Sequence, residues 1–250
     1  MKLFKRAVLV ALILVCLMGT NLVAKSLINF KEIYDQDIGA TITSIQDQDN
    51  YIEIHQVDDT FLEALISIED KRFYSHQGFD PLAIGRSVML NTFHGEIVSG
   101  ASTITQQVAK NIFLTFDQTY ERKLTEVILA IYLEEHYSKE EIIELYINII
   151  YYGEGQHGIY QAANHYFNKA PHDLNAHESV LLACIPQWPS RYALTDHYQL
   201  AAERSEVILQ AMMEASYIDT KERLAISQAI QEGVKYVDIE GQGFDQILWK

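Results

Sequence analysis

The sequence predicts a mostly α-helical globular domain that follows an apolar N-terminal helix. Hydrophobic residues make up 48% of the 250 positions and charged residues 21%, which is enough for a sizeable packed core. From about residue 58 onward, apolar residues recur at helical spacing, as in the face formed by Leu62, Leu65 and Ile66. Helix-capping residues recur along the same region, and an uncharged apolar run stands near the N-terminus.

The apolar run covers residues 7–24 and is preceded by Lys2, Lys5 and Arg6. Its length is about that of a minimal transmembrane helix, and the basic flank would keep the N-terminus in the cytoplasm. We predict an uncleaved membrane anchor; the alternative is a signal peptide that is cleaved after Ala24. The predicted regions are a cytoplasmic stub and transmembrane anchor (1–27), a juxtamembrane connector with a short strand near 40–45 (28–55), a globular domain (56–235) and a tail (236–250).

Capping signals predict where the helices of the domain begin. The later helices are expected over about 118–136, 138–153, 199–216 and 220–232, giving eight or so in total. The predicted N-caps are Asp58 or Asp59, Asp80 before Pro81, Ser102 or Thr103, Ser138 with Glu141, and Asn175 with Glu178.

The chain is acidic, with 34 acidic and 19 basic side chains and a formal net charge of -15. General nucleic-acid binding is therefore excluded, because it needs a basic face. An anionic substrate would have to be held by a local cluster of Lys and Arg. The two cysteines, Cys16 and Cys184, have no metal-binding spacing and are interpreted as packing residues.

Two carboxylates, Glu69 and Asp70, end an apolar helix and precede a loop with Phe73, His76 and Gly78. Partial desolvation would raise the pKa of such a carboxylate and make it a competent general base. The alternative is a solvated helix end in which Asp70 and His76 hydrogen-bond each other and shape the loop.

A second block runs from Gly100 to Asn111, where a glycine leads into a helix N-terminus rich in hydroxyl groups. The free backbone N–H groups and the helix dipole favour an anion there, and Lys110 adds a formal charge. An ordinary capped helix with a polar face would have the same pattern.

A third block places Arg122, Lys123 and Glu126 on one helical face. It is either a surface ion pair or a basic clamp for a pyrophosphate that contains an oriented carboxylate. A fourth block, residues 138–148 and 151–159, combines core spacing with three glycines and is interpreted as scaffold.

In this order, the four blocks resemble the motifs of the peptidoglycan glycosyltransferases, glycosyltransferase family 51. The first block fits the pattern EDxxFxxHxG without departure, GASTITQQVAKN is close to the most distinctive block of the family, and Arg122, Lys123 and Glu126 fit RKxxE. The fourth block has Ile147 where Leu is usual. PQWPSRY at 186–192 resembles a later segment, with Ala193 and Leu194 in place of Asn-Pro, and Arg204 with Val207 and Met212 resembles a weaker last block. The resemblance covers about residues 55–215.

The resemblance implies a lysozyme-like α fold with a large lobe and a small, membrane-facing lobe. It implies transfer of a donor MurNAc C1 to the C4 hydroxyl of an acceptor GlcNAc, with inversion and release of undecaprenyl pyrophosphate from lipid II. Glu69 and Glu126 would be catalytic, as the base and as the organiser of the leaving-group site. The substrate-binding candidates are Arg86, Ser102, Thr103, Gln107, Lys110, Asn111, Arg122 and Lys123, and the structural ones are Asp70, Phe73, His76 and Gly78. No cofactor is required for certain; Mg²⁺ or Mn²⁺ is left open, with Glu126 as its ligand.

The implied partners are lipid II, the growing glycan strand, the lipid bilayer and other cell-wall synthesis proteins, and no nucleic acid. The implied location is the bacterial cytoplasmic membrane, with the catalytic domain on its outer side. The chain has no S-x-x-K or K-T-G, and about 35 residues follow the matched region, so a monofunctional enzyme is expected. Two alternatives stay open: a lytic transglycosylase or muramidase, and an inactive scaffold for cell-wall synthesis.

Overall fold

The computed structural model describes the backbone of residues 2–96, 100–115 and 117–240, and side chains from residue 14 to residue 234 within these ranges. This part of the chain is mostly α-helical with three short 3₁₀ turns, which confirms the prediction of a mostly α-helical domain. The α-helices are α1 (Lys2–Tyr34), α2 (Ile38–Gln46), α3 (Asp59–Glu69), α4 (Pro81–His94), α5 (Ile104–Phe113), α6 (Tyr120–His136), α7 (Lys139–Ile149), α8 (Ile159–Phe167), α9 (Ala176–Cys184), α10 (Pro189–Tyr192), α11 (Leu194–Glu214) and α12 (Thr220–Glu240).

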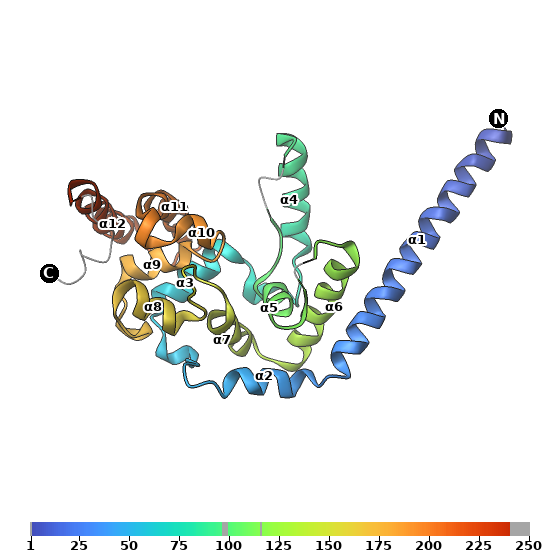
Figure 1. The fold of residues 1–250 in the computed structure, drawn as a ribbon. Helices are drawn as coiled ribbons and strands as arrows, with labels where there is room; N and C mark the ends of the chain where they lie inside the picture. Colours follow the sequence, from blue (N-terminus) through green and yellow to red (C-terminus); the bar gives the residue numbers. More distant parts are fainter. Residues whose placement is uncertain (1, 97–99, 116, 241–250) are drawn as a thin grey trace.

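The helices gather in two groups (Figure 1). Helices α3 and α8 to α12 lie together on one side, and α4 and α6 lie on the other, with α5 and α7 between the groups. Helix α4 stands upright beside α5, and α1 projects away from the domain.

The core lies where α3, α9 and α11 pack against one another. Phe61 and Leu65 of α3, Leu181 of α9 and Leu209 of α11 are all completely buried there. Because α3 is fixed on two sides by these contacts, its C-terminal end, which carries Glu69, has a defined position.

The predicted helix starts are confirmed by side-chain caps. Where two residues were left open, Asp58 caps α3 and Thr103 caps α5. Three of the predicted starts are complete capping boxes, in which the cap and the third helical residue bond each other's backbone N–H: Thr103 with Gln106, Ser138 with Glu141, and Asn175 with Glu178.

Three local predictions were wrong. The strand near 40–45 is helix α2, in which Ile38 and Ile42, one turn apart, are buried. The helix expected to reach about residue 153 ends at Ile149, because Ile150 is already extended; the chain then turns through left-handed conformations at Gly153 and Glu154. Helix α11 begins at 194, five residues before the predicted 199, and α12 extends to 240, beyond the predicted 232. The tail predicted over 236–250 is therefore helical over its first five residues. Residues 241–250 lie outside the described part of the chain.

Helix α1 packs along α6, far away in sequence. Ser26 is completely buried at their crossing, and its hydroxyl donates to the backbone oxygen of Glu121 at 3.0 Å. Lys25 forms an ion pair with the Glu121 carboxylate at 2.8 Å. The connector predicted over 28–55 therefore begins inside a helix that is already docked on the domain.

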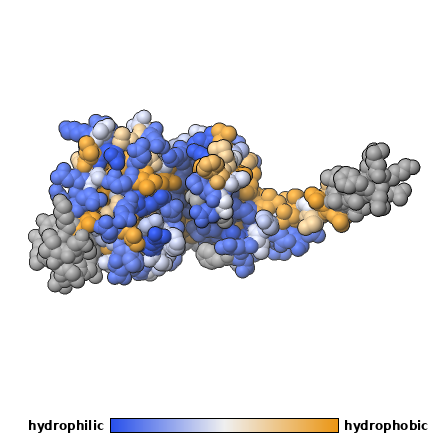
Figure 2. All heavy atoms as spheres, turned by 90° about the horizontal axis from the view of Figure 1, so that it is seen from above, coloured by the Kyte–Doolittle hydropathy of each residue, from blue (hydrophilic) through white to orange (hydrophobic). Residues whose placement is uncertain are grey.

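The exposed part of α1 carries apolar side chains, including Leu14, Leu17 and Met18 (Figure 2). Over the described residues, no helix keeps enough apolar length to cross a membrane. The side chains of residues 1–13, which include the first half of the predicted anchor, lie outside the described part.

Candidate active site

A cleft of about 220 Å³ lies between the C-terminal end of α3 and the beginnings of α4 and α5. It brings the first two sequence blocks together, although they are about thirty residues apart in the chain. Its lining residues are Ile68, Glu69, Asp70, Lys71, Arg72, Asp80, Ala83, Arg86, Gly100, Ala101, Ser102 and Thr103.

Glu69 is the last residue of α3 and is partly buried. Burial raises the pKa of Glu69 above its usual range, as predicted, because removal from water disfavours the charged carboxylate. Three groups oppose this: Gln107, whose Nε2 donates to Oε2 of Glu69 at 2.7 Å, and the positive charges of Arg204 and Lys110. Glu69 is therefore a carboxylate whose protonated form is favoured more than that of an exposed glutamate.

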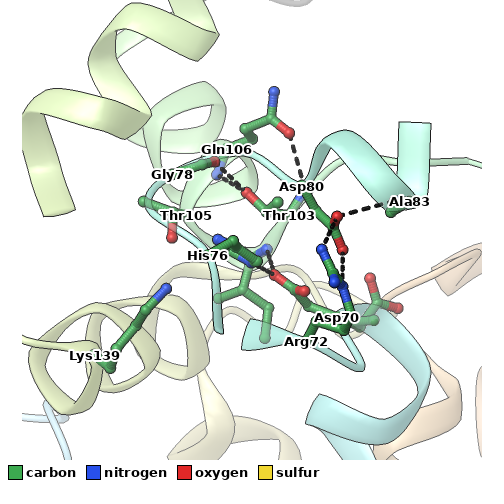
Figure 3. A network of polar contacts seen from close by, with 12 residues as sticks. Asp70, Arg72, His76, Gly78, Asp80, Ala83, Thr103, Thr105, Gln106 and Lys139 are labelled. Carbon is green, nitrogen blue, oxygen red and sulfur yellow. Dashed lines mark hydrogen bonds and ion pairs between the residues drawn. The ribbon is translucent and has the colours of Figure 1, made fainter. Parts of the chain in front are cut away.

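The neighbouring carboxylate, Asp70, has a different environment (Figure 3). It is buried, and its Oδ2 accepts from His76 Nε2 at 2.9 Å and from the backbone N–H of Ile104 at 3.0 Å. Ile104 is the first residue of α5, so Asp70 satisfies a free N–H at that helix end. The hydrogen bond between Asp70 and His76 that the alternative interpretation expected is present, but both side chains are buried and not solvated. Through Asp70, these bonds fix α5 to the end of α3.

Further charged groups extend from His76 into the interior. His76 Nδ1 lies 3.6 Å from the Glu134 carboxylate, and both side chains are buried. Glu134 also binds Lys139 at 2.7 Å and accepts from the hydroxyl of Thr105. Sequence reasoning missed Glu134 and Lys139, because each stands in an ordinary helix and gains its partners only from tertiary packing.

The beginning of α4 is held by Asp80 and Arg72 (Figure 3). The Asp80 carboxylate accepts from the Arg72 guanidinium, at 2.8 Å from Nε, and from the backbone N–H groups of Leu82 and Ala83. These bonds favour the charged form and lower the pKa of Asp80 to about 2. Asp80 is therefore a charged cap at one wall of the cleft.

Gly78 and Thr103 fix the loop between the cleft and α6. The Thr103 hydroxyl donates to the backbone oxygen of Gly78 at 2.7 Å, and Thr103 is buried. Gly78 has φ +82°, and a Cβ there would lie 2.7 Å from the backbone carbon of Ala130. Only glycine fits this close approach to α6.

The cations of the third block lie beside the cleft on the first turns of α6. The ammonium group of Lys123 donates to Ser102 Oγ at 2.7 Å and to the buried carboxylate of Glu126. Arg122 Nη1 lies 4.0 Å from the other Glu126 oxygen. We call Lys110, Arg122 and Lys123 the cation cluster.

Lys110 connects this cluster with Glu69. Burial lowers the pKa of Lys110, while Glu126 and Glu69 both raise it by their negative charge. Its ammonium makes no ion pair within 4 Å in the part of the chain that the structure describes. Lys110 is thus a half-buried cation that lies between two carboxylates and remains available for an anionic ligand.

The surroundings of Glu126 do not fit a resident divalent cation. Its carboxylate faces Lys123 and Arg122, whose positive charges would repel a metal ion. Over the described residues, no group of three or more His, Cys, Asp and Glu side chains is placed to hold one.

A family model described as Transglycosylase matches residues 36–213. The chain belongs to the transglycosylase family. The family membership predicted from the four blocks is confirmed by this match.

Similar proteins include penicillin-binding protein 1F of Bacillus subtilis, 44% identical over 76% of this chain and 27% of the relative. Penicillin-binding protein 1A of Aquifex aeolicus is 42% identical over 67% of this chain and 23% of its own length. Penicillin-binding protein 1A of Neisseria gonorrhoeae is 40% identical over 74% of this chain and 23% of its own length. The chain spans about a quarter of the length of these relatives.

Most predicted site residues of the transglycosylase domain lie around the cleft, but not all of them line it. Arg86, Ser102 and Thr103 do, and Thr103 also caps α5, whereas Gln107 bonds Glu69 without being part of the lining. Asn111 is exposed beside Lys110 and is not part of the lining.

Two further residues near Glu69 were not predicted as site residues. Arg204 comes from α11 and lowers the pKa of Glu69, and Tyr146 of α7 bonds the partner of Glu69, Gln107. The weak last block contained Arg204, so that resemblance was a usable signal; the helical spacing of Tyr146 indicated only a core position.

Proposed function

We propose that this transglycosylase domain is a peptidoglycan glycosyltransferase that polymerises lipid II into glycan strands. Family membership and the similarity to penicillin-binding proteins support the reaction class. The observation that carries the proposal is that Glu69 and the cation cluster lie at the same cleft. Lys110 interacts electrostatically with Glu69, and Lys123 bonds Ser102, which lines the cleft together with Glu69. Glycosyl transfer from a pyrophosphate needs these two parts together, a base and a set of cations.

In the proposed reaction, Glu69 takes the proton from the C4 hydroxyl of the acceptor GlcNAc. The oxygen attacks C1 of the donor MurNAc from the face opposite the leaving group, and the bond from C1 to the pyrophosphate oxygen breaks. Undecaprenyl pyrophosphate leaves with the bonding electrons, and C1 is inverted. The raised pKa of Glu69 makes its carboxylate a stronger base than an exposed one.

The cation cluster would stabilise the negative charge that develops on the leaving pyrophosphate. The chain as a whole carries a charge of -15, so this attraction must come from nearby groups. Glu126 forms ion pairs with Lys123 and Arg122 and holds both in place, while the ammonium group of Lys110 makes no ion pair within 4 Å among the described residues. We therefore assign Lys110 the strongest direct contact with the phosphates and Glu126 an organising role.

The substrate is a lipid, and we propose that the domain works at the outer surface of the cytoplasmic membrane with residues 7–24 as its anchor. The uncharged run behind a basic flank supports this arrangement. Exposed apolar side chains on α4 support a second contact with the bilayer: Leu82, Val88, Met89 and Phe93. These 250 residues contain no S-x-x-K or K-T-G, so the proposed activity does not include peptide cross-linking.

The test compares Glu69→Gln with Glu63→Gln, a change of the same type on the same helix. With labelled lipid II, Glu69→Gln should lose a factor of ~10²–10⁴ or more in rate, because the base is removed. Glu63→Gln should keep the wild-type rate, and both variants should keep the wild-type unfolding temperature. A folded Glu69→Gln variant that polymerises at a near wild-type rate would contradict the assignment, and release of fragments from sacculi would favour the lytic alternative.

A further inference from the structure

A buried chain of hydrogen bonds leads from α7 through α5 to Glu69. We propose that Tyr146 and Gln107 are positioning residues that hold the Glu69 carboxylate in the orientation and charge state that accept a proton. This inference rests on the proposed role of Glu69 as the general base.

The geometry orients the amide of Gln107. Its Nε2 donates to Oε2 of Glu69 at 2.7 Å, and its Oε1 accepts from the hydroxyl of Tyr146 at 3.2 Å. The two ends of an amide have nearly the same shape, so hydrogen bonds decide which end faces which neighbour. The Tyr146 hydroxyl supplies a donor to the oxygen end, and the NH₂ end is therefore directed at Glu69.

The reversed amide would place Oε1 against the carboxylate. Two acceptors cannot bond unless one of them carries a proton, so the reversed amide would favour protonated Glu69, which is useless as a base. The hydroxyl of Tyr146 does not touch Glu69, but by donating to Oε1 it supports the amide orientation that favours charged Glu69.

The scaffold around this chain is rigid. Tyr146 is completely buried in α7, which packs directly on α5. The preceding glutamine, Gln106, belongs to the cap of α5, where its Oε1 accepts from the backbone N–H of Thr103 at 3.0 Å. Of the two adjacent glutamines, one therefore fixes the helix and the other faces the catalytic carboxylate.

Several charges act on Glu69 besides this hydrogen bond. Burial raises its pKa most strongly, and Gln107 is the largest opposing contribution, ahead of the cations. The titratable groups that face it come from four helices and their ends: Asp70 after α3, Lys110 of α5, Tyr146 of α7 with Tyr152 beyond it, and Arg204 of α11.

The test is the pH dependence of kcat/KM for lipid II polymerisation by the full chain and its Tyr146→Phe variant. Phenylalanine removes only the hydroxyl, so Gln107 can reverse and the pKa of Glu69 should rise. The acid limb of the profile should then move up by about 0.5–1 pH unit, and by about one unit or more in Gln107→Leu, where the bond is lost entirely. On the high-pH plateau, Tyr146→Phe should return close to the wild-type rate.

Tyr152→Phe is the matched control. Tyr152 is also completely buried and lies near enough to Glu69 for that carboxylate to raise the pKa of its phenol, but its hydroxyl has no hydrogen-bond partner among the described residues. Its removal should leave the acid limb in place. Ionisation of the substrate is common to all variants and cancels in the comparison.

Titration of the Glu69 carboxyl carbon by NMR measures the same change without turnover. If lipid II is not polymerised at all, the proposed function fails, while the titration still tests the positioning of Glu69. The inference is overturned if Tyr146→Phe and Gln107→Leu titrate as the wild type does, or if Tyr152→Phe shifts Glu69 as far as Tyr146→Phe.

Discussion

Replacing Gly78 with alanine should destabilise the domain strongly. The residue has φ +82°, where an L side chain costs about 1–2 kcal/mol. The new Cβ would also lie 2.7 Å from the backbone of Ala130 in α6, and overpacking of this kind typically costs about 1–3 kcal/mol. Together the two effects give roughly 2–5 kcal/mol, which corresponds to a fall in Tm of about 5–20 °C for a chain of this size.

Two other glycines separate these effects. Gly155 has φ +80°, but a Cβ at this position would meet no atom within 4 Å, so Gly155→Ala carries only the backbone cost. Gly85 lies inside α4 with open space around it, and Gly85→Ala should gain up to about 1 kcal/mol from helix propensity. The expected order of Tm is Gly78→Ala, Gly155→Ala, wild type and Gly85→Ala, from lowest to highest.

Thermal unfolding followed by circular dichroism measures this order. Gly78→Ala should also lose activity below its Tm, because a displaced loop moves Thr103 and the start of α5 beside the cleft. If Gly78→Ala and Gly155→Ala unfold within about 2 °C of each other, the contact with Ala130 is not the reason for glycine at this position.

Two more predictions concern the edges of the site. The pKa of Asp80 in the folded state, about 2, lies below its ordinary value of 3.8. The bonds of Asp80 to Arg72 therefore stabilise the fold fully at pH values well above 3.8. This stabilisation is lost as the pH falls from about 5 to 2. The Tm difference between wild type and Asp80→Asn should therefore shrink over that range, and a constant difference would contradict it. Ser26→Leu should lower both the Tm and the rate of lipid II polymerisation, because the larger side chain would separate α1 from α6. Ser26→Ala should change little. If both variants behave alike, the contact between α1 and α6 can accommodate a larger side chain and the prediction is wrong.

The helix starts and the identity of the site blocks could be predicted from the sequence because their causes are local. A cap such as Ser138 and its partner Glu141 lie within one turn, so the spacing itself carries the interaction. The predicted pair of Asp70 and His76 is similarly short in sequence.

The strand near 40–45 was predicted wrongly because alternation over six residues fits a half-buried strand equally well. What decided the outcome was one buried face, with Ile38 and Ile42 four residues apart. The partners of Gln107 could not be predicted for a related reason. Tyr146 of α7 and Glu69 of α3 contact Gln107 from separate helices. These contacts depend on how α7 and the end of α3 pack against α5.

Glu69 and Asp70 are adjacent at the end of α3 but have different environments, because the backbone leaves the helix between them. Asp70 follows the last helical residue, and its short side chain reaches the first N–H of α5 and His76, so all its bonding serves the fold. Glu69 is still helical, and its longer side chain lines the cleft, where the amide of Gln107 is its one hydrogen-bond donor among the described residues. A base needs this incomplete bonding, because a carboxylate already saturated by donors holds its charge too firmly to accept a proton. The contacts of Glu126 support its proposed role as organiser of the leaving-group site, because its buried carboxylate is held between Lys123 and Arg122.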